Sequence, residues 1–309
     1  MCGIAGLIYR DGPRPIGRDL TLMLQSMKHR GPDSTGYALY GPPGDGYVMR
    51  ATLADGNGVP HFELHDMLQR HRAEVQRRLR SLGARVEDVS DATEYAITVK
   101  FAYDGDLKTI ADYLEDIRGV EVLSLGHSLE IVKDLGDAES VAAGYGLDAF
   151  QGSHAIGHVR MATESDVDIA NAHPYWAYPF SDVAVVHNGQ LTNYFEWRRR
   201  LERAGHRFQS ECDSEIIAVY LAERMTGGDT LEAAMRRSLD ELDGVFTYIC
   251  VTEDALGVAK DELAAKPLVL YEADDLVALA SEEIAIRAVV GHEIDTYDPD
   301  EGEVMVWAR

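Results

Sequence analysis

The chain changes character between residues 57 and 146, and this interruption divides it into an insertion and two flanking segments. Both flanking segments contain short apolar stretches of strand length, such as 3–9 near the start and 154–159 after the insertion. The insertion opens with a highly charged helical stretch and continues with a strand, a helix and two more strands. This order predicts an α/β protein in which residues 2–56 and 147–309 form one layered domain and residues 57–146 form a small α/β module with its own core.

Strands dominate the segment after the insertion, and helices interrupt them. The apolar stretches predict strands over 154–159, 182–187, 244–251, 255–260, 267–271 and 276–280, and the helical spacing predicts helices over 192–204, 213–225 and 229–240. Near the start of the chain, apolar residues recur at helical spacing within 18–28. Strands from both ends of the chain therefore favour a layered sandwich of sheets and helices.

Length and charge exclude several classes of protein. A chain of 309 residues agrees with one large domain plus an insertion, or with two domains. The formal net charge of −24 argues against a nucleic-acid partner and against binding to an anionic membrane surface. We find no apolar run of the roughly 18 residues that a membrane span needs and no basic segment of a signal peptide. Three cysteines form no disulfide framework, so we expect a cytoplasmic enzyme.

Cys2 directly follows the initiator Met1, which is usually removed when the next residue is small. Removal would leave Cys2 with both a thiol nucleophile and a free α-amine that can act as a base. An α-amine and a thiol titrate within about one pH unit of each other, so a proton can pass between them near neutral pH. The alternative is a small apolar residue that begins a strand, and position alone does not separate the two interpretations.

Two arginines lie in motifs that suit ordered polar contacts. Arg30 lies on a Gly-Pro turn that follows the first predicted helix, within His29-Arg-Gly-Pro-Asp33. Arg160 ends the predicted strand 154–159, where its guanidinium could bind a carboxylate in a bidentate way. Both could instead form ion pairs at the surface.

Asn188 and Gly189 follow the apolar strand 182–187. An Asn side-chain amide and a Gly backbone N–H at a strand end make a workable oxyanion hole, although this residue pair is also typical of tight turns. Asp213 lies near a predicted helix start, where an Asp commonly serves as the N-cap.

Taken together, these motifs closely resemble the class II glutamine amidotransferase domain, a member of the N-terminal-nucleophile hydrolases. The resemblance covers nearly the whole chain except the insertion. The matching stretches are Cys2-Gly-Ile-Ala-Gly6, His29-Arg-Gly-Pro-Asp33, His158-Val-Arg-Met-Ala-Thr163, His173-Pro174, His187-Asn-Gly189, Asp213-Ser-Glu215, Leu242-Asp-Gly-Val-Phe246, Lys266-Pro-Leu268 and Ala280-Ser-Glu282. The fold that this resemblance implies is a four-layer α/β/β/α sandwich, in which two antiparallel sheets stack between layers of helices.

The resemblance also implies catalytic roles. Cys2 would attack the side-chain amide of glutamine, and its own α-amine would carry the proton. Asn188 and Gly189 would hold the oxyanion of the tetrahedral intermediate.

Four further residues would bind or surround the substrate. Arg160 would pair with the α-carboxylate of glutamine and Asp213 with its α-ammonium. Arg30 would organise the loop of the nucleophile, and Thr163 would line the pocket. The chain departs from many family members where they carry Trp and His, because Met161 and Glu164 stand here. Closure on glutamine is therefore expected to be looser.

Family members usually carry this domain fused to a synthase that consumes ammonia. The chain stops just past 301–306, and we find no phosphate-binding loop, dinucleotide fingerprint or zinc spacing, so we expect the acceptor chemistry on another chain. His61 and His65 offer no obvious third ligand, and no metal site is expected.

Stand-alone chains of this kind are similar to the amidotransferase subunit of glutamate-synthase-like complexes, and N-methylglutamate synthase is the nearest in kind. This similarity implies a hetero-oligomer with a flavin-containing subunit that carries FMN and with a β-helix-type subunit. It implies no cofactor in this chain. The insertion is expected to help hold that assembly together. A glutaminase subunit of another synthase, or an inactive scaffold or glutamine sensor, is the alternative.

Overall fold

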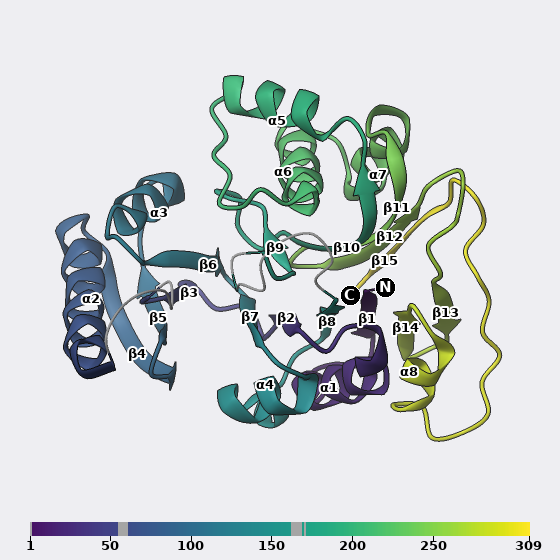
Figure 1. Ribbon diagram of the computed structural model, residues 1–309, viewed down its shortest axis with the longest axis horizontal. Coiled ribbons are helices and arrows are strands. Elements are labelled where there is room, and N and C mark those ends of the chain that lie inside the picture. Colours follow the sequence, from purple (N-terminus) through teal and green to yellow (C-terminus); the bar gives the residue numbers. More distant parts are fainter. Residues whose placement is uncertain (1, 55–60, 162–168, 170) are drawn as a thin grey trace.

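The computed structural model of the chain describes residues 2–54, 61–161, 169 and 171–309, and these form three antiparallel sheets (Figure 1). The six-stranded sheet has the order β13 (Val269–Glu272), β14 (Leu276–Ala280), β1 (Gly3–Tyr9), β8 (His154–Arg160), β2 (Ser34–Tyr40) and β7 (Leu129–Leu135). The five-stranded sheet has the order β15 (Val304–Ala308), β12 (Ala255–Lys260), β11 (Gly244–Val251), β10 (Ala184–Leu191) and β9 (Tyr175–Trp176).

Helices cover the outer face of each of these two sheets. The helices α1 (Ile16–Ser26), α4 (Ala138–Tyr145) and α8 (Glu283–Arg287) lie on the six-stranded sheet, together with the short helices η1 (Lys28–Arg30) and η2 (Leu147–Ala149). The helices α5 (Tyr194–Arg203), α6 (Asp213–Thr226) and α7 (Leu231–Glu241) lie on the five-stranded sheet. The two sheets face each other between these helices (Figure 1). The predicted α/β class is confirmed.

β1 shows why the sequence takes this arrangement. Its residues are buried on both faces because the strand runs between β14 and β8, inside the stack. Ile4 and Ile8 point into the core between the two sheets, whereas Ala5 and Leu7 point to the core under α1. Alternate residues of a strand face opposite sides, so burial of both sides produces a continuous apolar run.

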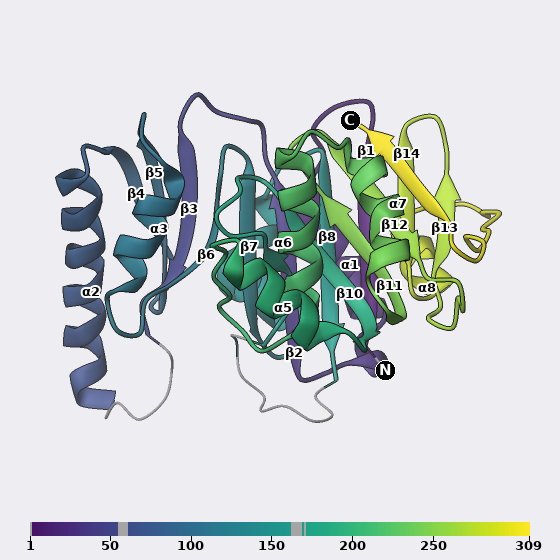
Figure 2. The same cartoon turned by 90° about the horizontal axis from the view of Figure 1, so that it is seen from above.

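The third sheet belongs to the small module. Its order is β4 (Arg85–Thr93), β5 (Ala96–Ala102), β3 (Tyr47–Thr52) and β6 (Glu121–Gly126), and the helices α2 (His61–Ser81) and α3 (Leu107–Glu115) pack against it. Seen from above, the module projects from one end of the layered body, and α2 is its outermost element (Figure 2).

The pairing of the strands shows that the boundaries of the module differ from the predicted residues 57 and 146. β3 lies in the first flanking segment, which was expected to belong to the layered domain. It instead pairs with β5 and β6 in the module's sheet. The last of the strands predicted within the insertion was expected in the module, but as β7 it pairs with β2 in the six-stranded sheet. The chain passes from one sheet to the other within the short turn between β6 and β7, and no linker-like composition marks that crossing.

Asp182 fixes the turn between β6 and β7. Its carboxylate accepts hydrogen bonds from the backbone N–H groups of His127 (2.7 Å), Ser128 (2.9 Å) and Leu129 (2.9 Å). A Cβ atom on Gly126 would lie 2.4 Å from Asp182 Oδ1, so the turn and the carboxylate are in close contact. The place where the module rejoins the body is therefore held by a buried carboxyl group. None of the described helices is long and apolar enough to cross a membrane.

Candidate active site

Cys2 lies at the entrance of β1, and contacts from distant motifs converge on its backbone. Its carbonyl oxygen accepts hydrogen bonds from Asn188 Nδ2 (3.2 Å) and from Arg30 Nε (3.1 Å). Its Sγ lies 3.9 Å from the carbonyl oxygen of Met161. The side chain is half-buried, so the thiol stands at the edge of the core rather than inside it. Both sheets thus contribute to the surroundings of this one residue.

Arg30 ends η1 and is buried. Its Nη1 forms an ion pair with Oε1 of Glu282 at 2.5 Å. Glu282 is the residue that directly precedes α8. The next residue, Gly31, presses on the backbone of Arg160, since a Cβ there would lie 2.4 Å from the carbonyl carbon of Arg160. A side chain at position 31 would separate the two motifs, so glycine is required for this close approach.

Glu282 belongs to the site, although the sequence predicted no role for it there. Partial burial opposes ionisation, but hydrogen bonds from Arg30 and His29 keep the pKa of the Glu282 carboxyl below its ordinary value. The preceding residue, Ser281, exchanges hydrogen bonds with Ile4 next to the nucleophile. The motif Ala280-Ser-Glu282 was recognisable in the sequence, but its pairing with Arg30 arises only from the pairing of β14 with β1.

Asn188 and Gly189 lie within β10 and pair with Thr247 and Phe246 of β11, so the tight-turn alternative is wrong. Gly189 has a φ of +147°, and a Cβ there would lie 2.2 Å from the carbonyl oxygen of Val245. Only glycine fits this backbone conformation and this space without strain. The pair is therefore built into the sheet edge beside Cys2.

Asp213 is the first residue of α6, and Cys212 holds the N-cap position without a side-chain capping bond. The Asp213 carboxylate instead accepts a hydrogen bond from the backbone N–H of Leu191 (2.7 Å), at the end of β10. This contact ties the start of α6 to the strand that carries Asn188. Its position in the first turn also suits the helix dipole.

Arg160 ends β8 and is buried, paired in register with Ser34. Its backbone carbonyl accepts a hydrogen bond from the N–H of Asp33, in the loop that carries Arg30. The predicted site residue Thr163 and the departure at Glu164 lie outside the described residues. Cys2, Arg30, Asn188 and Arg160 are thus linked through contacts among their own motifs.

Three buried histidines lie beneath this site. The ring centroids of His158 and His173 are 4.1 Å apart, and those of His173 and His187 are 6.4 Å apart. Ser214 Oγ lies 3.1 Å from His173 Nε2 and 2.7 Å from His187 Nδ1, so it bridges two of the rings. Burial lowers the pKa of all three, and that of His158 falls to about 3. At neutral pH the rings form a polar but uncharged support under Asn188.

The buried histidines, His154 included, predict a loss of stability on acidification. Burial lowers the pKa of His154 to about 4 and that of His158 to about 3, from an ordinary value of 6.5. Below pH 6.5 the unfolded chain binds protons that the folded chain excludes, at about 1.4 kcal/mol per pH unit for each such group. Burial raises the pKa of Glu115 to about 7, and this carboxyl acts in the opposite direction. We expect the free energy of unfolding to fall by about 1 to 3 kcal/mol between pH 6.5 and 5.5.

Urea unfolding at pH 7.5, 6.5 and 5.5 measures this dependence. A stability that is constant or rises on acidification would contradict this expectation.

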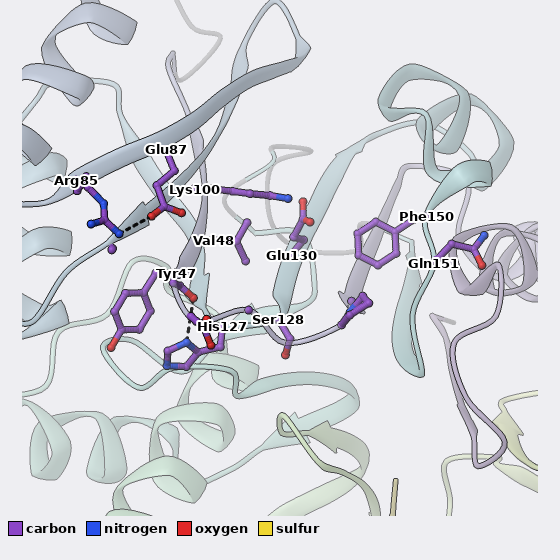
Figure 3. Close-up of a pocket in the computed structure, with 16 residues that line it drawn as sticks. Tyr47, Val48, Arg85, Glu87, Lys100, His127, Ser128, Glu130, Phe150 and Gln151 are labelled. Atoms are coloured by element: carbon purple, nitrogen blue, oxygen red, sulfur yellow. Dashed lines mark hydrogen bonds and ion pairs between the residues drawn. The ribbon is translucent and has the colours of Figure 1, made fainter.

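A separate cavity of about 520 Å³ lies at the seam between the module and the six-stranded sheet (Figure 3). Lys100 of β5 points toward Glu130 of β7 across it, while Arg85 pairs with Glu87 at 3.0 Å within the module. Among the residues that the structure describes, none of the predicted site residues lines this cavity. The seam is therefore distinct from the surroundings of Cys2.

Comparison with known proteins identifies the family of the chain. The model of the glutamine amidotransferase domain family matches residues 158–288. A protein from Methanothermobacter thermautotrophicus that carries the name of a glutamine amidotransferase is 38% identical over 280 residues, covering 89% of each chain. The glutamine amidotransferase-like protein GlxB of Rhizobium meliloti is 36% identical over 277 residues, covering 89% of this chain and 87% of its own. The chain belongs to the class II glutamine amidotransferase family.

Two solved structures show the same fold. Glutamine phosphoribosylpyrophosphate amidotransferase from B. subtilis aligns with 99% of this chain at a TM-score of 0.60 and 20% identity. A structure described as the allosteric regulatory enzyme of purine biosynthesis aligns with 99% of this chain at a TM-score of 0.62 and 21% identity. This chain spans 47% and 46% of those two chains, about half of their length.

Proposed function

We propose that this chain hydrolyses the side-chain amide of glutamine to glutamate and ammonia, with Cys2 as the nucleophile. The observation that carries the proposal is the convergence of Asn188 and Arg30 on the carbonyl of Cys2. An N-terminal nucleophile lacks a preceding peptide bond to fix it, so contacts to its own carbonyl are the means of holding its thiol in place. The layered sheets and helices then serve as the four-layer sandwich of an N-terminal-nucleophile hydrolase.

The proposed chemistry uses the thiol and the α-amine of Cys2 and two hydrogen-bond donors, one from Asn188 and one from Gly189. After removal of Met1, the α-amine of Cys2 takes the thiol proton while Sγ attacks the amide carbon of glutamine. The oxyanion receives hydrogen bonds from Asn188 Nδ2 and the Gly189 N–H. The amine then gives its proton to the leaving nitrogen, the C–N bond breaks, and ammonia departs. Water attacks the thioester, glutamate is released, and the thiol is restored.

Charged groups at the end of one strand and at the start of one helix would bind the amino-acid end of glutamine. Arg160, at the end of β8, suits the α-carboxylate because a guanidinium binds a carboxylate through two parallel hydrogen bonds. Asp213, held by Leu191 N–H, suits the α-ammonium. Thr163 is the further residue to which the resemblance gives a role in this pocket. These partners would fix the substrate so that its side-chain amide points to Cys2.

Hydrolysis of glutamine by the purified chain tests the proposal directly. The intact mass should show loss of Met1, and ammonia release should then be measurable. A glutamine analogue that carries an electrophile in place of the amide should label Cys2 and stop the reaction. A chain that lacks Met1, yet neither releases ammonia nor reacts with the analogue, would contradict catalysis and favour a scaffold or sensor.

We further propose that the chain is the amidotransferase subunit of a glutamate-synthase-like complex, with N-methylglutamate synthase as the specific candidate. A flavin-containing subunit would carry FMN and a β-helix-type subunit would complete the assembly. The projecting module supports this proposal because it offers a surface beyond the layered body (Figure 2). Ammonia released into water is protonated and diluted, so docking to a synthase allows a sheltered transfer.

Co-expression with a flavin-containing synthase subunit tests the complex. The expected result is co-purification of a yellow hetero-oligomer with a defined mass and flavin content. A stable monomer that captures no such subunit, and that hydrolyses glutamine at full rate alone, would contradict it.

A further inference from the structure

Glu115 ends α3 of the module, and its side chain reaches the larger domain. The carboxylate is only 10% exposed and accepts a hydrogen bond from the Val122 N–H at 3.0 Å, within the module. Its other donors come from the layered body: Gln209 Nε2 at 2.6 Å, and Arg207 through its guanidinium. One buried carboxylate therefore joins the module to the segment before α6.

Arg207 makes a second link to the same helix. Its Nη1 lies 3.4 Å from Asp112 Oδ1, and its guanidinium stacks over the ring of Tyr178 at 4.6 Å. Asp112 in turn accepts a hydrogen bond from the Tyr178 hydroxyl. Asp112 and Glu115 are three residues apart and so share one face of α3.

The segment held by Glu115 is also held from the opposite side. The backbone N–H groups of Gln209 and Ser210 donate to the two oxygens of Glu215, each at 2.8 Å. Ser210 Oγ donates to the same carboxylate at 2.7 Å. Glu215 is buried in the first turn of α6, two residues after Asp213. The conformation of residues 207–211 is thus tied directly to the turn that carries Asp213.

We infer that Glu115 is a positioning residue for the glutamine site: it holds residues 207–211 in the conformation that places Asp213 for the substrate ammonium. This inference rests on the proposed function. Cys2 directly precedes β1 and Asn188 lies in β10, and both are fixed by their own contacts. Loss of the Glu115 contacts should therefore weaken glutamine binding and leave the chemical step nearly unchanged.

The test compares Glu115→Ala and Glu115→Gln with a matched control, Glu130→Ala. Glu130 of β7 pairs with Arg50 of β3 at 2.7 Å, with side chains 16% and 10% exposed, and so also joins the body to the module. Glu130 lines the seam cavity, whose lining does not include residues 207–211 (Figure 3). The control thus removes a carboxylate of similar burial from the same boundary.

The expected result for Glu115→Ala is a KM for glutamine raised roughly 10-fold, with kcat changed less than about twofold, because binding rather than chemistry is lost. Glu115→Gln keeps an acceptor oxygen and should show a smaller rise. In hydrogen exchange, the amides of Gln209 and Ser210 should exchange faster in Glu115→Ala than in the parent. In Glu130→Ala, both the exchange rates of these amides and the KM for glutamine should match those of the parent.

Equal KM changes in Glu115→Ala and Glu130→Ala would overturn the inference, since they would reflect general loosening of the module. Unchanged exchange at Gln209 and Ser210 in Glu115→Ala would also overturn it. Failure of the parent chain to hydrolyse glutamine would refute the proposed function, and the exchange measurement would still decide whether Glu115 holds residues 207–211.

Discussion

Replacing Cys2 with alanine should reduce glutamine hydrolysis by at least about 10⁴-fold, because removal of a nucleophile eliminates the covalent route. The fold should persist, since Asn188 and Arg30 contact the backbone carbonyl of residue 2 rather than its thiol. An assay of ammonia release checks the loss of activity, and circular dichroism on the same samples checks that the fold persists.

Cys250→Ala is the matched control. Cys250 is fully buried in β11, where burial raises the pKa of its thiol well above the ordinary value. Its removal should cost some stability but leave kcat near that of the parent. Substantial ammonia release by a folded Cys2→Ala chain would end the assignment of the nucleophile.

Asn188→Ala should lower kcat by about 10²- to 10³-fold, the usual effect of removing one oxyanion donor. The Nδ2 group that donates to the Cys2 carbonyl at 3.2 Å is the group we assign to the oxyanion, so its loss also loosens the nucleophile. KM should change less than kcat, because the donor acts mainly on the transition state. Steady-state kinetics on a folded sample separates the two parameters.

Asn193→Ala provides a comparison from the same region. Asn193 Nδ2 donates to the carbonyl of Glu241 at 2.9 Å, and its Oδ1 accepts from the Asp243 N–H at 3.0 Å. Its loss should therefore lower thermal stability without a specific effect on kcat. If Asn188→Ala behaved in the same way, Asn188 would be a structural residue.

The local elements of the body that were predicted are long and periodic, whereas the strands β2 and β9 were not predicted. The strand at 3–9 and the helix within 18–28 correspond to β1 and α1, and the Asn-Gly pair was placed at the end of an apolar strand. The motifs around Cys2, Arg30 and Asn188 were also recognisable as short local patterns. What the sequence could not show directly is their convergence, which depends on the stacking of β1 against β10.

The remaining features depend on partners that are distant in sequence. An apolar strand such as β7 has the same alternation whichever sheet it joins, so its membership was misassigned. Glu115 and Gln209 are 94 residues apart, and neither position carries a local signal of their contact. Glu282 pairs with Arg30 across 252 residues for the same reason. Long-range pairing, rather than local preference, decided each of these features.

The pairing of β3 with β6 has a consequence for how such a chain can change. Val48 and Gly126 are register partners, so the chain leaves the body and returns to it at adjacent points. An insertion with neighbouring ends can be shortened, lengthened or exchanged without separating the strands on either side. The module could therefore be replaced by another insertion without rearranging the layered body. The chain of such an insertion would have to rejoin the body at the turn that the carboxylate of Asp182 holds.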